Sequence, residues 1–440
     1  MKPLFIISCP IDTYSGYGAR SRDLVKAIIE LDKYDVKILP QRWGSTPWNF
    51  IKNNYTKWGF LEPYLLPPGN QLPAKPKIWA QVTIPNEFQP VGDYNIGFTA
   101  GIETTVCNPT WIEGLNRMDL NVVSSNHAKE VFQNLKFDTQ DQQGQKIGEI
   151  FLKKPVEVLF EGADLSTYFP SKEKNSINLD NIEENFAYLF VGHWMQGVVG
   201  EDRKNVGLLL QSFYETFKNQ KKTPALILKT SHAGASYMDR EVILDKINQV
   251  RSSIKADTLP NVYLLHGEFS DEEINDLYNH KKVKAMVSLT KGEGFGRPLL
   301  EFSLTKKPII ATNWSGHIDF LDEKYTTLIN GELKQIHDSA VVKDILLKEG
   351  SWFAPNVMEF SQHLQNMFKN YKSYEKGAML QYHKSKNNFS FGGMKELLEN
   401  TLNVYVPEFP ENIKLELPKL NLPKLQKPSS FPNLKPVENV

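Results

Sequence analysis

Short apolar segments alternate with longer amphipathic segments along most of this chain, and no other feature limits its possible folds as much. The apolar segments are bounded by glycine, proline or charged residues, which is typical of short strands buried in a sheet. In the amphipathic segments, such as 19–32 and 204–217, apolar side chains recur on one face of a helix. Strands that alternate with helices through two successive halves predict two doubly wound α/β domains.

The expected strands fall into two groups, one for each domain. They are 4–8, 36–40, 77–82, 94–99, 121–125 and 156–160 in the first group, and 186–192, 225–230, 261–267, 284–290, 308–312 and 326–329 in the second. Glycine, aspartate and proline interrupt the pattern between Glu161 and Ser171, so we expect the hinge there. The predicted boundaries are 1–165 for the N-terminal domain, 166–387 for the C-terminal domain, 388–406 for a helix crossing back to the first domain, and 407–440 for an extended tail rich in proline and lysine.

Composition narrows the class of protein. The 51 basic and 51 acidic residues cancel, so no overall charge attracts nucleic acid. Cys9 and Cys107 are the only cysteines, which argues against a disulfide framework and fits a reducing compartment. The N-terminal apolar run is too short for a signal peptide, and no apolar run is long enough to predict a transmembrane helix. We therefore expect a cytoplasmic protein.

The segment 291–301, KGEGFGRPLLE, places Glu293 on a glycine-rich turn and Glu301 eight residues later. An apolar strand precedes the turn, and Pro298 suits the first turn of a helix. Backbone N–H groups in such a loop can bind a phosphate. The alternative is a structural turn before a solvated helix, where an acidic side chain is favourable in any case. The motif alone leaves both interpretations open.

The wider sequence resembles a known family. The span 261–321 is similar to the C-terminal signature of the family 4 retaining glycosyltransferases of the GT-B fold, with E-G-F-G-x-x-x-x-E at its centre. The similarity covers about 186–330. The segment 156–170 resembles the linker between the two domains of this family, with Gly162 and Asp164 matching.

This resemblance implies the fold and the site. It implies two Rossmann-like domains facing across a cleft, with the acceptor on the first and a nucleoside diphosphate sugar on the second. Glu293 is then the catalytic residue, orienting the sugar hydroxyls or stabilising positive charge. Glu301 would hold the ribose. The implied donor-binding residues are Gly16, Arg203, Lys204, Gly294, Phe295, Gly296 and Glu301.

Two positions of the expected site depart from the family pattern, as do Phe160, Glu161 and Ala163 in the linker. His193 occupies the place of an expected arginine, which leaves the diphosphate to Arg203 and Lys204. The first domain has Glu103 where many members carry a histidine beside the reacting sugar. Glu103 and His127 are candidate contacts to the acceptor or the sugar, and purely structural roles remain open for both.

Neither a metal nor a cofactor is expected. The sequence has no D-x-D motif, and its histidines lack metal-binding spacing. The Gly16–Gly18 turn lacks the third glycine of a dinucleotide fingerprint, because Ser21 stands there.

The resulting hypothesis is a metal-independent retaining glycosyltransferase. Its partners would be a nucleotide-sugar donor and a glycan, protein or other hydroxyl acceptor. Two alternatives stay open. One is a catalytically silent GT-B protein that binds a nucleotide sugar or glycan. The other is a GT-B epimerase or phosphorylase.

Overall fold

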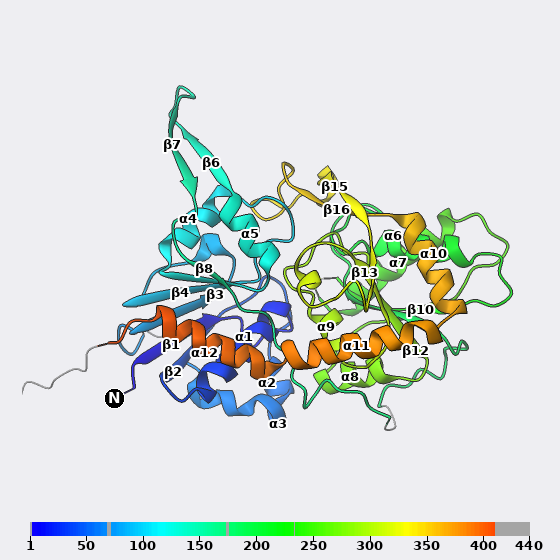
Figure 1. Cartoon of the computed structure of the whole chain (residues 1–440), viewed down its shortest axis with the longest axis horizontal. Helices are drawn as coiled ribbons and strands as arrows, with labels where there is room; N and C mark the ends of the chain where they lie inside the picture. Colours follow the sequence, from blue (N-terminus) through cyan, green and yellow to red (C-terminus); the bar gives the residue numbers. More distant parts are fainter. Residues whose placement is uncertain (1, 68–71, 173–175, 233, 410–440) are drawn as a thin grey trace, which may run out of the picture. The chain divides into compact units, whose positions relative to one another are not determined.

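Two parallel sheets of six strands each organise the computed structural model of the chain, which describes residues 2–67, 72–172, 176–232 and 234–409 (Figure 1). The first sheet has the order β2-β1-β3-β4-β5-β8, with β1 at Leu4–Cys9, β2 at Asp35–Pro40, β3 at Ile78–Val82, β4 at Tyr94–Thr99, β5 at Leu120–Val123 and β8 at Val156–Val158. The second has the order β11-β10-β9-β12-β13-β14, with β9 at Ala187–His193, β10 at Ala225–Ser231, β11 at Val262–Leu265, β12 at Val283–Val287, β13 at Ile309–Thr312 and β14 at Thr327–Ile329.

Every predicted strand segment forms one of these strands, so the α/β prediction is confirmed. We call the part of the chain built on the first sheet the first lobe, and the part built on the second sheet the second lobe.

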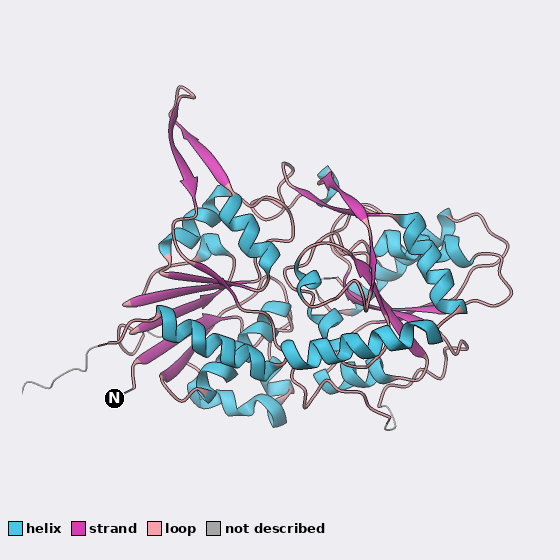
Figure 2. Cartoon of the chain, viewed as in Figure 1, coloured by secondary structure: helices cyan, strands magenta, loops and turns pink. Residues whose placement is uncertain are grey.

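The second sheet is buried on both faces. Along β9, Tyr188 and Phe190 enter one hydrophobic core, whereas Ala187 and Leu189 enter the other. Successive side chains of a strand point to opposite faces, so a strand between two helical layers must be apolar throughout. The helices α6, α7 and α10 supply one core, and α8, α9 and α11 supply the other (Figure 2). Their bounds are Val206–Phe217, Tyr237–Ser253, Val357–Lys369, Asp271–Asn279, Arg297–Ser303 and Lys372–Asn388.

The last helix, α12 (Phe391–Tyr405), packs against α1 (Gly16–Glu30) of the first lobe. Ion pairs at 2.7 Å join Lys33 to Glu399 and Lys395 to Glu30. The other helices of this lobe are α2 at Phe50–Asn53, α3 at Tyr55–Trp58, η1 at Gly59–Tyr64, η2 at Pro85–Glu87, α4 at Pro109–Arg117 and α5 at Asn126–Asn134. At the start of α12, the Phe391 N–H donates to the Ala163 carbonyl at 2.8 Å, and the Ala163 N–H donates to the Phe389 carbonyl at 2.9 Å, so the two segments that connect the lobes run side by side.

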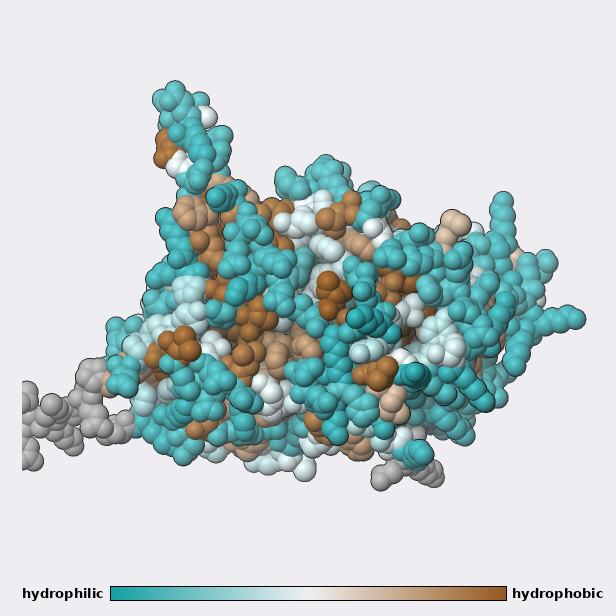
Figure 3. All heavy atoms as spheres, in the orientation of Figure 1, coloured by the Kyte–Doolittle hydropathy of each residue, from teal (hydrophilic) through white to brown (hydrophobic). Residues whose placement is uncertain are grey.

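Two antiparallel hairpins were not anticipated from the sequence. One pairs β6 (Lys136–Gln140) with β7 (Lys146–Phe151), and it projects from the first lobe with a mostly hydrophilic surface (Figures 1 and 3). The other pairs β15 (Gly331–Gln335) with β16 (Ser351–Pro355) in the second lobe. Both β6 and β15 lack an apolar run, because neither is covered by a helical layer.

Residues Lys2–Pro407 form one compact unit. Residues 410–440, most of the predicted tail, lie outside the described residues. Among the helices that the structure describes, none has the length and apolar character needed to cross a membrane.

The start of α1 gives a test of local packing. A Cβ at Gly18 would lie 2.3 Å from the Thr13 carbonyl oxygen, whereas a Cβ at Gly16 would meet no atom within 4 Å. We expect Gly18→Ala to destabilise the protein by about 1–3 kcal/mol, since the Thr13 backbone must move. Gly16→Ala should change stability by less than about 0.5 kcal/mol. Urea unfolding of the two variants measures the difference, and equal stabilities would contradict this packing.

Candidate functional site

Glu293 lies on the loop that joins β12 to α9, as predicted. The loop turns at Gly296, whose φ of +94° favours glycine, and Pro298 follows in the first turn of α9. The loop after β13 holds the Glu293 backbone in place. The Glu293 N–H donates to Ser315 Oγ at 2.9 Å, and the Gly316 N–H donates to the Glu293 carbonyl at 3.0 Å. Local sequence and one tertiary contact together therefore fix this carboxylate.

Two cations from the segment before α6 converge on Glu293. Lys204 Nζ lies 2.6 and 2.7 Å from the two carboxylate oxygens, and Arg203 Nη1 lies 3.6 Å from Oε2. Arg203 also donates to the Gly292 carbonyl at 2.9 Å and lies 3.4 Å from Glu103 of the first lobe. We call Glu103, Arg203, Lys204 and Glu293 the Glu293 cluster. The charges of its two cations and two carboxylates cancel.

Burial and the neighbouring charges shift the pKa of Glu293 in opposite directions. Burial alone raises the pKa of a carboxyl, but the attraction of Lys204 and Arg203 is larger in sum and lowers the pKa of Glu293 to about 2. Burial lowers the pKa of Lys204, while Glu293 opposes that change. Glu293 is thus ionised at neutral pH, and it can accept hydrogen bonds from hydroxyl groups.

Glu301, the second carboxylate of the motif, is engaged at both oxygens. Arg297 Nε donates to Oε1 at 2.8 Å, and the Tyr278 hydroxyl donates to Oε2 at 3.3 Å. The same guanidinium lies 2.5 Å from Asp23 of α1 and 3.8 Å from Glu161. We call Asp23, Glu161, Arg297 and Glu301 the Arg297 cluster. Burial raises the pKa of Glu301 to about 7, although Arg297 acts against that shift.

The glycines of the motif are also required by a contact between the lobes. A Cβ at Gly292 would lie 1.9 Å from the Glu103 carbonyl oxygen, and one at Gly294 would lie 2.7 Å from that of Ala100. The segment after β4 therefore touches the loop backbone. Glycine at these positions allows this close approach, whether or not a ligand also uses the loop.

The remaining predicted residues take different positions. The Phe295 side chain is only 3% exposed and packs in the core, 5.1 Å from the Phe320 ring, so a ligand could meet only its backbone. Gly16 is exposed at the start of α1. The His127 ring lies 4.6 Å from Trp314 of the second lobe, and its Nε2 is buried without a partner among the described residues.

Four residues of the site were not predicted from the sequence: Arg297, Asp23, Tyr278 and Ser315. A signal existed for Arg297, because it precedes Glu301 by four residues on one helix, a spacing at which opposite charges pair. No local pattern connects Asp23, Tyr278 or Ser315 to the motif.

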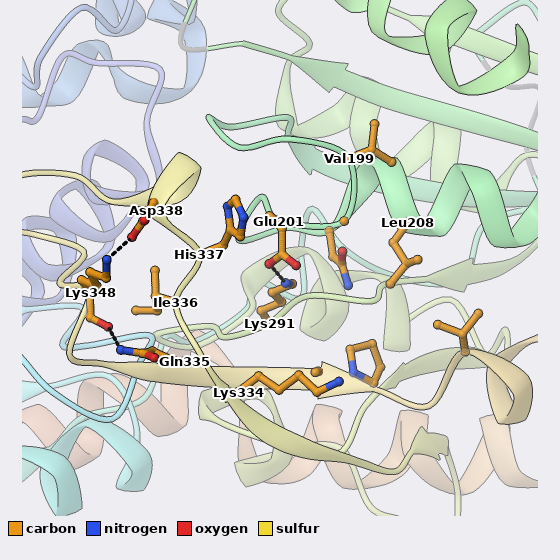
Figure 4. A pocket seen from close by; sticks show the side chains of 15 residues that line it. Val199, Glu201, Leu208, Lys291, Lys334, Gln335, Ile336, His337, Asp338 and Lys348 are labelled. Atoms are coloured by element: carbon orange, nitrogen blue, oxygen red, sulfur yellow. Dashed lines mark hydrogen bonds and ion pairs between the residues drawn. The ribbon is translucent and has the colours of Figure 1, made fainter. Parts of the chain in front are cut away.

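A cavity of about 590 Å³ lies in the second lobe beside the site (Figure 4). It is lined by the segment before α6 and by the β15–β16 hairpin, and none of its lining residues belongs to either cluster. Two ion pairs lie in its lining, Lys291 with Glu201 and Lys348 with Asp338, both at 2.7 Å (Figure 4), and a fifth charged lining residue, Lys334, pairs with Glu332 outside the lining. Within the part of the chain that the structure describes, no group of three His, Cys, Asp or Glu side chains could hold a metal ion.

Part of the second lobe matches a known protein family. Residues 201–376 match the family model described as "Glycosyl transferases group 1", and this range contains Arg203, Lys204, Glu293 and Glu301. The resemblance predicted from the glycine motif is thereby confirmed. No curated protein is significantly similar to this chain in sequence.

Solved structures resemble the whole fold. Anabaena HepE, in complex with UDP and glucose, has a TM-score of 0.58 at 12% identity, covering 91% of this chain and 100% of HepE. Sucrose-phosphate synthase from Thermosynechococcus elongatus has a TM-score of 0.58 at 12% identity, with coverages of 92% and 99%. A glycosyltransferase from Rickettsia africae has a TM-score of 0.54 at 14% identity, with coverages of 92% and 98%. At such identities the likeness establishes the fold alone, which is GT-B-like.

The Glu293–Lys204 pair can be tested through stability. We expect Glu293→Gln to cost about 3–5 kcal/mol at pH 7, because it leaves a buried ammonium without its carboxylate. The double variant Glu293→Gln/Lys204→Met should be more stable than that single variant. Since the folded-state pKa of Glu293 is depressed, its stabilisation is present above pH 4.5 and is lost as the pH falls toward 2. Urea unfolding across this range measures the effect.

The exposed pair of Lys334 and Glu332 in the same lobe, 3.1 Å apart, is the matched control. Glu332→Gln should cost less than about 1 kcal/mol. Equal losses of unfolding free energy in Glu293→Gln and Glu332→Gln would show that the buried pair stabilises the fold no more than the exposed pair.

Proposed function

We propose that this chain transfers a sugar from a nucleoside diphosphate donor to an acceptor hydroxyl, because residues 201–376 match the family model of the group 1 glycosyltransferases. The proposal includes retention at the anomeric carbon and no requirement for a metal. The observation that supports it most is the Glu293 cluster, in which two cations reach one buried carboxylate on the glycine loop. A diphosphate and a sugar need this combination of cations and a hydrogen-bond acceptor in one place.

Each cluster residue has a role in this proposal. Arg203 and Lys204 neutralise the diphosphate as it leaves, together with backbone N–H groups around Gly294 to Gly296. Glu293 accepts hydrogen bonds from the sugar hydroxyls, or stabilises the positive charge that develops as the bond to phosphate lengthens. Lys204 is shared between Glu293 and the diphosphate, so donor binding must rearrange the ion pair seen here.

The acceptor is assigned to the first lobe. Glu103 lies within reach of Arg203, and His127 contacts Trp314, so both first-lobe residues face the second-lobe loops. In the retaining reaction proposed for this family, the acceptor oxygen attacks on the face that the diphosphate leaves. The bond from the anomeric carbon to the diphosphate oxygen breaks, and the diphosphate takes the acceptor proton.

A binding protein without turnover is the second candidate. The observation that favours it is the state of Glu301, since Arg297 and Tyr278 occupy both oxygens assigned to the ribose. Binding of a nucleotide sugar without conversion would support this candidate, and turnover would exclude it. Isomerisation of the donor without an acceptor would indicate an epimerase instead.

We expect a nucleoside diphosphate to raise the melting temperature in EDTA, because it binds the folded state alone. UDP is the first probe, since the HepE structure contains it, followed by GDP, ADP, TDP and their sugar conjugates. Glu301→Ala should weaken binding of the active nucleotide at least tenfold, through lost contacts to the ribose. Glu293→Ala should lower turnover more than binding.

The exposed Glu332→Ala variant is the control for these measurements, and it should match the wild type. No shift with any nucleotide, or wild-type binding and turnover in both site variants, would refute the proposed site.

Donor affinity should depend on pH through Glu301. The ribose hydroxyls donate hydrogen bonds, so they need the ionised carboxylate, and the Glu301 pKa is about 7. Affinity for UDP-glucose, which has no group titrating in this range, should rise about tenfold between pH 6 and pH 8. Calorimetry at both pH values measures this, and Glu301→Gln should flatten the profile. If the affinity of Glu301→Gln still rises with pH as in the wild type, Glu301 does not contact the ribose.

A further inference from the structure

One guanidinium connects the two lobes at the glycine motif. Arg297 belongs to α9 of the second lobe, and its Nη1 lies 2.5 Å from Asp23 Oδ2 in α1 of the first lobe. Its Nε donates to Glu301 at 2.8 Å, and Glu161 of the connecting segment lies 3.8 Å from Nη1. A planar guanidinium is suited to this because its donors point in several fixed directions at once.

The contacts are shielded from water. The carboxylate side chains of Asp23 and Glu301 are each 7% exposed, and that of Glu161 is 10% exposed. Ion pairs in such surroundings are screened far less than those at the surface. The three carboxylates compete for one cation, so a change at any of them alters the strength of the other contacts.

Neighbouring elements add further charge to this cluster. Asp271 and Tyr278 of α8 and Tyr168 of the connecting segment face Glu301. Arg20 of α1 donates to the carbonyls of residues 159 and 160 and so ties the connecting segment to the first lobe. The connecting segment, α1 and α9 therefore meet at the Arg297 cluster.

We propose that Arg297 is a positioning residue that couples nucleotide binding at Glu301 to the contact between α9 and α1. The proposal rests on the ribose role of Glu301 given above. Ribose hydroxyls that donate to Glu301 share its carboxylate charge with Arg297 Nε, so they weaken the Arg297–Glu301 contact. The guanidinium then pairs more strongly with Asp23 and Glu161, which strengthens the link between the lobes.

This coupling is reciprocal. If the nucleotide strengthens the Asp23–Arg297 contact, then that contact must strengthen nucleotide binding by the same factor. Asp23 does not reach the predicted ribose site itself, because Arg297 lies between them. A purely structural ion pair would contribute to stability without affecting nucleotide affinity.

The test compares Asp23→Asn with Asp35→Asn, an exposed carboxylate of the same lobe. We expect Asp23→Asn to weaken UDP binding about fivefold or more, the lower end of typical coupling, and Asp35→Asn to leave it unchanged. Hydrogen exchange followed by mass spectrometry gives the second readout. In the wild type, UDP should slow amide exchange both in 293–303 and in 20–26 of α1. In Asp23→Asn the effect should persist in 293–303 and disappear from 20–26.

Each outcome separates this inference from the proposed function. If UDP protects 293–303 and Asp23→Asn binds it with wild-type affinity, the coupling is refuted while the nucleotide site stands. If UDP protects neither segment, the proposed site fails for this nucleotide, and the coupling to it fails as well. The rate of amide exchange without UDP then tests the contact between the lobes. If Asp23→Asn does not exchange faster than Asp35→Asn in 297–303, that contact is also refuted. Arg297→Lys, which keeps the charge but loses the forked geometry, should behave like Asp23→Asn in affinity and provides a second variant if that one does not fold.

Discussion

A backbone contact between the lobes underlies the whole site. The loop at Gly292 to Gly294 touches the carbonyls of Ala100 and Glu103 so closely that a Cβ at either glycine would collide with them. This contact brings Glu103 within 3.4 Å of Arg203, and Arg203 in turn lies beside Glu293. The charged groups of both lobes meet because no side chain separates the two backbones.

The two carboxylates of the motif show how environment divides the roles of identical residues. Glu293 and Glu301 are both buried, yet the pKa of the first is lowered to about 2 and that of the second is raised to about 7. Two cations form ion pairs with Glu293, whereas Glu301 shares one guanidinium with Asp23 and Glu161. One carboxylate is thus permanently charged at neutral pH, and the other is poised to change its charge with its surroundings.

Much of the fold could be predicted because its signals are local. Strands buried between helical layers must be apolar on both faces, so the segments at 186–192 and 225–230 stand out in the sequence. Strands β6 and β15 carry no such signal, because neither contains an apolar run. The site was predictable to the same extent. The motif identified Glu293, and the family resemblance identified Arg203 and Lys204, but the core position of Phe295 and the Asp23 contact of Arg297 depend on the tertiary fold.

By itself, the sequence determined two α/β halves, a glycine turn that carries a carboxylate before a proline-started helix, and a pair of cations ahead of another helix. Those features follow from apolar periodicity and from the backbone preferences of glycine and proline, which act over a few residues. Only the tertiary structure decided which charges pair. Lys204 reaches Glu293 across 89 residues and Arg297 reaches Asp23 across 274. The physical reason is that an ion pair depends on distance in space and on exclusion of water, and neither is encoded by the residues adjacent in the chain.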